Sequence, residues 1–228
     1  MVFNVAIGWD KAEIAAYHVC AHSIIRNASD PVSILPLNKR HLNWFTNNDN
    51  KASTEFAFSR FLVPYLYNYE GYTLFMDSDM LVRNDIYKLL DLVDPEMAVS
   101  VVKHQYSPKM GDKFLGQEQT DYAKKNWSSV MLFNNEKCRM LTKEYVNSAK
   151  GLDLHRFEWC EDKFIGSLPR SWNYLVGEEV ESQPDADIVH FTRGGPYFKE
   201  YENCQYAEEW RAYWREANSV LDRRVLHV

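Results

Sequence analysis

Two aspartates, Asp77 and Asp79, interrupt an apolar stretch of the chain, YTLFMDSDMLV at residues 72–82. Apolar runs of about four to eight residues are typical of strands buried on both faces of a sheet. Carboxylates at the end of such a strand are costly to desolvate unless a cation compensates them, and Mg²⁺ and Mn²⁺ prefer carboxylate oxygens. Because ligands of open α/β sheets bind beyond the carboxyl ends of the strands, the pair is a candidate metal and phosphate site. Asp-x-Asp is short, however, and also occurs in turns and helix caps.

A histidine at the end of a later apolar stretch is the second candidate group. Residues 188–191, IVHF, predict a strand that carries His190, and TRGGPYF follows at residues 192–198. Gly194 and Gly195 permit a tight turn and close approach of the backbone to a ligand, and backbone N–H groups in such a loop can hold phosphate oxygens. A lone histidine at a strand end is more often structural than a ligand, so this motif gains weight only beside the aspartates.

The elements that must position these groups alternate between strands and helices. A segment resembling a capping box, Asp10 with Glu13, precedes a helix with Ile14, Tyr17, Ala21 and Ile24 on one face. Pro64 should kink or shorten a second helix. The alternation implies an α/β fold with a mostly parallel central sheet flanked by helices. We expect strands at residues 2–7, 32–37, 72–76, 98–103, 129–133 and 188–191, and helices after residue 13 and at 54–67, 137–149, 157–168 and 206–221.

The bulk properties limit the classes of protein. A length of 228 residues suits a single domain, with the aromatic C-terminal helix at 206–221 as a dimer contact or, preferably, an internal element packed on the body. A net charge of −6 argues against nucleic-acid binding, and no apolar run approaches the roughly 20 residues of a membrane span. The N-terminus has no signal-peptide pattern, and the four cysteines lie far apart, as in a cytoplasmic protein with reduced thiols. A monomer or a homodimer fits these properties.

Together the two motifs resemble a known family. A hydrophobic run ending in Asp-x-Asp, followed about 110 residues later by His-Phe-x-x-Gly-Gly-Pro-aromatic, is similar to the glycogenin-like family 8 glycosyltransferases. The resemblance implies a GT-A fold, a nucleotide-sugar donor that is a UDP-sugar, and Mn²⁺ or Mg²⁺ as cofactor. It also implies transfer with retention of anomeric configuration. By motif match the metal ligands are Asp77, Asp79 and His190, a set that suits manganese.

The resemblance extends along residues 2–198 and implies further site residues. The first strand and its loop would border the uracil ring, and Arg60 would contact the donor sugar or diphosphate. Segment 126–134, NWSSVMLFN, resembles a strand that contacts the sugar, with Ser129 where glycine is usual. Glu161 or Asp162 would face the transferred sugar, in a segment that Trp172 and Asn173 complete. The full set of donor-binding candidates is Ala6, Ile7, Gly8, Asp10, Arg60, Ser78, Asn126, Ser128, Arg193, Gly194 and Gly195, with Arg60, Glu161 and Asp162 as catalytic candidates.

Simpler roles are open for several of these residues. Asp10 can be a helix cap, Arg60 a surface salt bridge, and Glu161 and Asp162 a solvated helix face. One departure matters, because the family's Lys-Pro-Trp is replaced here by Gly195-Pro196-Tyr197. Arg193 or Lys199 would then have to supply the charge that contacts the diphosphate.

Three functions therefore compete. The first is a hexosyltransferase with a glycan, lipid or small-molecule acceptor, chosen by an irregular loop at residues 107–126. The second is a non-catalytic nucleotide-sugar binding protein on the same fold, since fold does not determine function. The third is a phosphatase of the haloacid-dehalogenase type, which also carries an apolar Asp-x-Asp but usually near its N-terminus.

Overall fold

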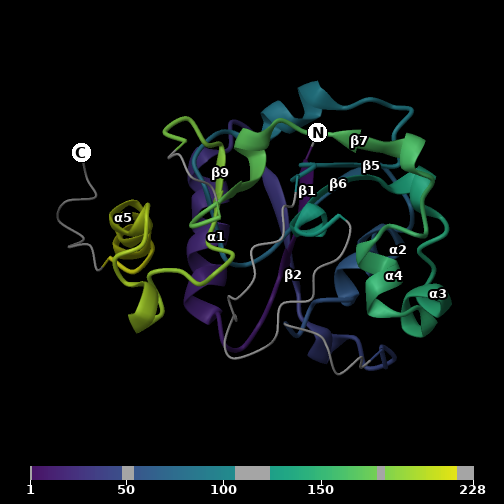
Figure 1. Ribbon diagram of the computed structural model, residues 1–228, viewed down its shortest axis with the longest axis horizontal. Coiled ribbons are helices and arrows are strands. Elements are labelled where there is room, and N and C mark those ends of the chain that lie inside the picture. The colour runs from purple at the N-terminus through teal and green to yellow at the C-terminus, as the bar shows by residue number, and fades with distance from the viewer. Residues whose placement is uncertain (1, 48–53, 106–123, 179–182, 220–228) are drawn as a thin grey trace.

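The computed structural model describes residues 2–47, 54–105, 124–178 and 183–219. A six-stranded sheet in the order β2-β1-β3-β6-β5-β7 forms its centre (Figure 1). All its strands run in one direction except β6, which is antiparallel to both of its neighbours. The mostly parallel sheet is thus confirmed. Its strands are β1 (Phe3–Gly8), β2 (Val32–Leu37), β3 (Tyr72–Met76), β5 (Val99–Val101), β6 (Val130–Asn134) and β7 (Ile165–Ser167).

Helices cover both faces of this sheet, as expected for the α/β class. Helix α1 (Ile14–Asn27) lies on one face, and α2 (Val63–Leu66), α3 (Lys143–Ser148) and α4 (Gly151–His155) lie on the other (Figure 1). The side chains of the strands alternate accordingly, because successive residues of a strand point to opposite faces. Ile7 packs in the cluster with α1, whereas its neighbour Ala6 packs in the cluster with α2 and α4. Both cores are rich in aromatic and branched side chains.

A second, three-stranded sheet and the C-terminal helix complete the α1 side. The small sheet has the order β4-β9-β8, formed by β4 (Met80–Val82), β9 (Ile188–His190) and β8 (Tyr174–Leu175). Helix α5 (Ala207–Ala217) packs against α1 and buries Trp210 and Tyr213, while Trp214 is 43% exposed (Figure 1). Short 3₁₀ turns occupy Lys39–His41, Ser59–Leu62, Ile86–Leu92, Trp127–Ser129, Asn135–Cys138, Asp162–Phe164, Arg170–Asn173 and Lys199–Tyr201.

Several local predictions differ from the structure. The helix expected at 157–168 is wrong, since Phe157 has a left-handed φ of 59° and residues 165–167 pair with β5 as strand β7. The helix expected at 54–67 is reduced to a 3₁₀ turn and α2, with Pro64 in its first turn, where proline is tolerated. The helix expected at 137–149 is also divided, into a 3₁₀ turn and α3.

Some expectations fall on residues beyond those described. Of the loop at 107–126, which we expect to select the acceptor, residues 107–123 lie outside the described residues. The last residues of the expected C-terminal helix, 220–221, also lie outside them. Within the described ranges, none of the helices has both the length and the apolar character that crossing a bilayer requires.

Candidate active site

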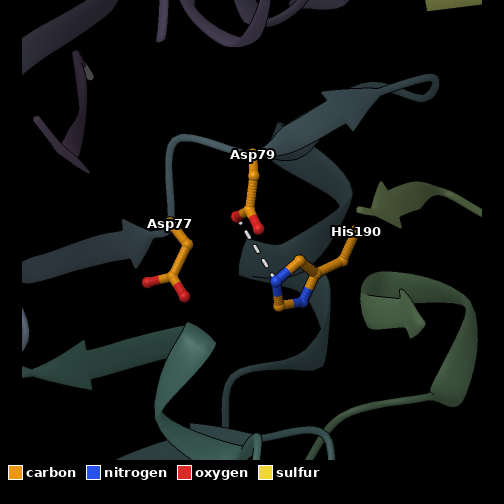
Figure 2. Close-up of side chains that lie close together, drawn as sticks. All are labelled: Asp77, Asp79 and His190. Carbon is orange, nitrogen blue, oxygen red and sulfur yellow. Dashed lines mark ion pairs between the residues drawn. The ribbon is translucent and has the colours of Figure 1, made fainter. Parts of the chain in front are cut away.

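The two sheets meet at the Asp-x-Asp turn. Asp77 follows β3 of the large sheet directly, and Asp79 directly precedes β4 of the small one. In the antiparallel pairing of β4 with β9, Met80 lies opposite His190, and the backbone N–H of Phe191 donates to the carbonyl of Asp79 at 2.9 Å. This register brings the histidine beside the aspartates across about 110 residues of sequence. Figure 2 shows the three side chains pointing into a common space.

The donor atoms of these three residues form a compact cluster. One ligand atom each of Asp77, Asp79 and His190 lies within 4.8 Å of the others, and Nε2 of His190 is 3.3 Å from Oδ1 of Asp79 (Figure 2). Oδ1 of both aspartates is buried, and its charged neighbours among the described residues, Arg60 for Asp77 and His190 for Asp79, form ion pairs without a well-aligned hydrogen bond. Native proteins rarely leave buried carboxylate oxygens in this state unless an ion or water completes them. Two carboxylates and an imidazole therefore fit a divalent cation such as Mn²⁺.

The charge balance of the cluster also favours a cation. Burial raises the pKa of Asp77 to about 6, and the attraction of Arg60 only partly opposes this. Burial alone would lower the pKa of His190, but the neighbouring carboxylates of Asp79 and Asp77 outweigh it and hold that pKa above its ordinary value. The cluster thus attracts positive charge, and a proton and a metal ion compete for Nε2 of His190.

Asn173 determines which nitrogen of His190 faces the aspartates. Its Nδ2 donates to Oγ of Ser129 at 2.9 Å and to the carbonyl of Asn126 at 3.4 Å, so its Oδ1 must be the atom 2.9 Å from Nδ1 of His190. An amide oxygen can only accept, so Nδ1 carries a hydrogen. Ligating histidines in metal sites commonly donate their second N–H in this way, which leaves Nε2 for the metal.

Arg60 lies inside the protein rather than on its surface. It is 5% exposed and stands between the rings of Phe56 and Phe75, each 5.1 Å from its guanidinium carbon. Its guanidinium donates to two carbonyls, of Ala57 at 3.0 Å and Ser128 at 2.9 Å, and pairs with Oδ1 of Asp77 at 2.8 Å. The surface salt bridge considered from the sequence is therefore wrong. Arg60 holds Asp77, the first of the metal-ligand candidates, and its contact with the donor stays a prediction.

Ser128 connects Arg60 to His155, a half-buried histidine. The carbonyl of Ser128 accepts from Arg60, and its Oγ shares a 2.7 Å hydrogen bond with Nδ1 of His155, at the end of α4. The ring of His155 stands edge-on to Phe61 at 5.3 Å between centroids. Burial and, to a lesser degree, the charge of Arg60 lower the pKa of His155 to about 3.

Because the pKa of His155 is lowered, we expect the protein to lose stability at acidic pH. The unfolded chain binds a proton at His155 below the ordinary histidine pKa of 6.5, whereas the folded protein does not until about pH 3, so stability falls as the pH falls through that window. His155→Asn keeps an atom that can bond Ser128 but does not titrate. Urea unfolding at pH 7.5 and 5.5 should show the wild type losing about 1 kcal/mol more than this variant, given about 1.4 kcal/mol per pH unit. Equal losses in both proteins would contradict the assignment.

The expected base-binding residues lie at the end of β1. The side chains of Ala6 and Ile7 are buried in the two cores, which leaves only their backbone for a ligand. A Cβ on Gly8 would lie 2.4 Å from the ring of Phe56, so packing alone requires this glycine. Asp10 accepts backbone N–H bonds from Ala12 and Glu55, both at 2.8 Å. Asp10 organises the loop but does not cap α1, which begins four residues later with Glu13 as its N-cap.

The two acidic catalytic candidates lie at the surface. The side chains of Glu161 and Asp162 are 69% and 81% exposed and pair with Lys163 and Lys124. Among the described residues, neither carboxylate has a hydrogen bond or ion pair with Asp77, Asp79 or His190. The structure does not bring these residues together with the cluster, and a role toward the transferred sugar stays a prediction.

The loop after β9 is shaped by its aromatic side chains. Gly194 has a φ of 119°, and a Cβ on it would lie 2.5 Å from the ring of Tyr201. A Cβ on Gly195 would lie 2.4 Å from the ring of Tyr197. Nε of Arg193 donates to Oε1 of Glu178 at 2.8 Å. The glycines therefore accommodate rings, and approach of this loop to a phosphate stays a prediction.

Glu13 is the site residue that the sequence analysis missed. It is 6% exposed, and its carboxylate accepts from Oγ of Ser78 at 3.1 Å and from the hydroxyl of Tyr197 at 3.2 Å. Burial, and then repulsion by Asp79, raises its pKa to about 8. The signal was present in the spacing, because Glu13 continues the buried stripe of Tyr17, Cys20 and Ile24 toward the N-terminus.

Solved structures with a similar fold are glycosyltransferases. The bifunctional glycosyltransferase WbbM is 17% identical with a TM-score of 0.66, over 99% of this chain and 51% of that one. The chain thus spans about half the length of WbbM. An active-site mutant of LgtC is 14% identical with a TM-score of 0.63, over 96% and 98% of the two chains, and another LgtC structure is described as a galactosyltransferase with donor and acceptor sugar analogues. These similarities confirm the GT-A fold, and membership of family 8 stays a prediction.

Sequence comparison identifies a relative over nearly the whole chain. No protein-family model matches the sequence. Protein CDI of Arabidopsis thaliana is 43% identical over 227 residues, which cover 95% of this chain and 87% of the plant protein. Identity at this level over this length establishes common descent, and the chain belongs to the same protein family as Protein CDI of Arabidopsis thaliana.

Proposed function

We propose that the protein is a metal-dependent glycosyltransferase of the family 8 type, which moves a hexose from a UDP-sugar to an acceptor hydroxyl with retention of configuration. One observation carries this proposal. The Asp77, Asp79 and His190 cluster, with a buried oxygen on each carboxylate, lies at the carboxyl edge of β3 in a GT-A fold. In such folds ligands bind beyond this edge, and β1, the expected base-binding strand, ends beside it.

The chain's own residues supply the frame for the reaction. Asp77, Asp79 and His190 would hold Mn²⁺ or Mg²⁺, and a cation there neutralises negative charge that develops on a leaving diphosphate. Asn173 keeps Nε2 of His190 directed at the aspartates, and Arg60 holds Asp77 in place. Glu161 and Asp162, the two acidic candidates after α4, are exposed and paired with Lys163 and Lys124, so we do not assign either as a covalent nucleophile. Attack by the acceptor on the same face as the leaving group fits retention best.

A specific observation favours one alternative, a non-catalytic nucleotide-sugar binding protein. The family's lysine before Pro-Trp is absent, and the charge of its nearest substitute, Arg193, is paired with Glu178. A weak diphosphate contact would lower turnover more than binding. The phosphatase hypothesis has no comparable support, because the solved structures of similar fold are glycosyltransferases.

Calorimetry tests the proposal directly. UDP and a panel of UDP-sugars are titrated into the wild-type protein with Mn²⁺ and again with EDTA. Metal-dependent binding supports the nucleotide-sugar site, and the tightest sugar becomes the donor for transfer assays across glycan, lipid and small-molecule acceptors. Binding without turnover on any acceptor would favour the non-catalytic alternative. Binding of no UDP compound would contradict the proposal.

A further inference from the structure

The carboxylate of Glu13 joins three segments that surround the cluster of Asp77, Asp79 and His190. Glu13 itself lies at the end of the loop after β1, and its backbone N–H donates to the carbonyl of Asp10 at 3.1 Å. Its Oε2 accepts from Ser78, the residue between the two aspartates, and its Oε1 accepts from Tyr197 in the loop after β9. Ser78 is fully buried, so its hydroxyl depends on this carboxylate for an acceptor.

Tyr197 reaches Glu13 because its ring is held in place on several sides. Gly195 leaves room for the ring, which a Cβ there would approach to 2.4 Å. The ring of Trp210 in α5 lies 5.6 Å from it between centroids, and that of Phe198 lies 4.7 Å away. Since Trp210 is buried against the body, a continuous set of contacts runs from α5 through Tyr197 and Glu13 to the Asp-x-Asp turn.

We propose that Glu13 and Tyr197 are positioning residues, which hold Ser78 and thereby keep both aspartates directed at His190. The hydroxyl of Tyr197 gives its ring a hydrogen-bonding role, because it donates to Oε1 of Glu13 at 3.2 Å. The inference rests on the proposed function only for the identity of the bound ion. The positioning itself is a property of the protein without metal or nucleotide.

Hydrogen exchange of the metal-free protein measures this positioning. Glu13→Ala leaves the hydroxyls of Ser78 and Tyr197 without their acceptor, so amides in segments 76–80 and 192–198 should exchange about tenfold faster or more. Glu13→Gln offers an oxygen to Ser78 and an N–H to Tyr197, and should exchange like the wild type. Tyr197→Phe retains the ring packing and should accelerate exchange mainly in 192–198. Glu158→Ala, at an exposed site, is the matched control.

The affinity for Mn²⁺ is a second test of the positioning role. It is measured by titration, in which the electron spin resonance signal of free Mn²⁺ decreases as the ion binds. Glu13→Ala should bind Mn²⁺ about 10- to 100-fold more weakly than the wild type, as for other residues that orient metal ligands, and Glu13→Gln should restore affinity. Unchanged exchange of both segments in Glu13→Ala would overturn the inference. The inference would also be overturned if the two segments exchanged as fast in Glu13→Gln as in Glu13→Ala, because the loss of hydrogen bonds would then not explain the faster exchange. If the wild type binds neither Mn²⁺ nor UDP, the proposed function fails while the exchange result still decides the positioning role.

Discussion

Asp79→Asn is expected to abolish metal-dependent binding of UDP-sugars. The substitution removes one of two charged ligands, while the amide keeps the size of the side chain and one oxygen near His190. Loss of a residue that merely orients a ligand weakens metal binding about 10- to 100-fold, so loss of the ligand itself should weaken it at least about a hundredfold. Calorimetric titration of UDP with Mn²⁺ should then resemble the wild-type titration in EDTA.

The matched control for this variant is Asp91→Asn. Asp91 lies at an exposed position near the end of the 3₁₀ turn Ile86–Leu92, and removing its charge changes the net charge equally. It should bind UDP and Mn²⁺ like the wild type. Circular dichroism of both variants should match the wild type, which separates loss of the ligand from loss of the fold. Unchanged metal-dependent binding by Asp79→Asn would place the metal elsewhere.

Local pattern is sufficient to predict the strand that precedes the two aspartates. The apolar run at 72–76 is too short for a helix and has no polar side, so a buried strand was the consistent interpretation, and β3 occupies it. The similarity of the two motifs to a known family then related Asp77 and Asp79 to His190. The physical reason for their proximity, the pairing of β4 with β9, was not predicted, because three-residue strands leave no period to recognise.

Tertiary contacts decided the positions where local pattern failed. Asp10 and Glu13 have capping-box spacing, yet the carboxylate of Glu13 turns inward to Ser78 and Tyr197, residues 65 and 184 positions away. Residues 165–167 become an edge strand because β5 offers them a partner, not because of any alternation in their sequence. Arg60 is buried because two rings and three acceptors surround it, which a single sequence does not reveal.

Arg60→Met is expected to destabilise the protein strongly. Methionine fills part of the space between Phe56 and Phe75 but leaves the buried Oδ1 of Asp77 without its cation, and breaking a buried ion pair from one side costs about 3–5 kcal/mol. For a chain of this size the melting temperature should fall by about 2–4 °C per kcal/mol. Arg60→Lys should recover only part of the loss, since one ammonium cannot replace a planar group that contacts Ala57, Ser128 and Asp77 together.

The double variant Arg60→Met/Asp77→Asn identifies the cause of that loss. If the unpaired charge of Asp77 is responsible, neutralising it should return stability, and the double variant should be more stable than Arg60→Met alone by about 1 kcal/mol or more. Urea unfolding in EDTA measures this coupling without any contribution from bound metal. Additive effects would mean that Arg60 acts through its carbonyl contacts and ring packing instead. A positive coupling would mean that this ion pair holds Asp77 in place in the metal-free protein, so that the ligand is already positioned when the cation arrives.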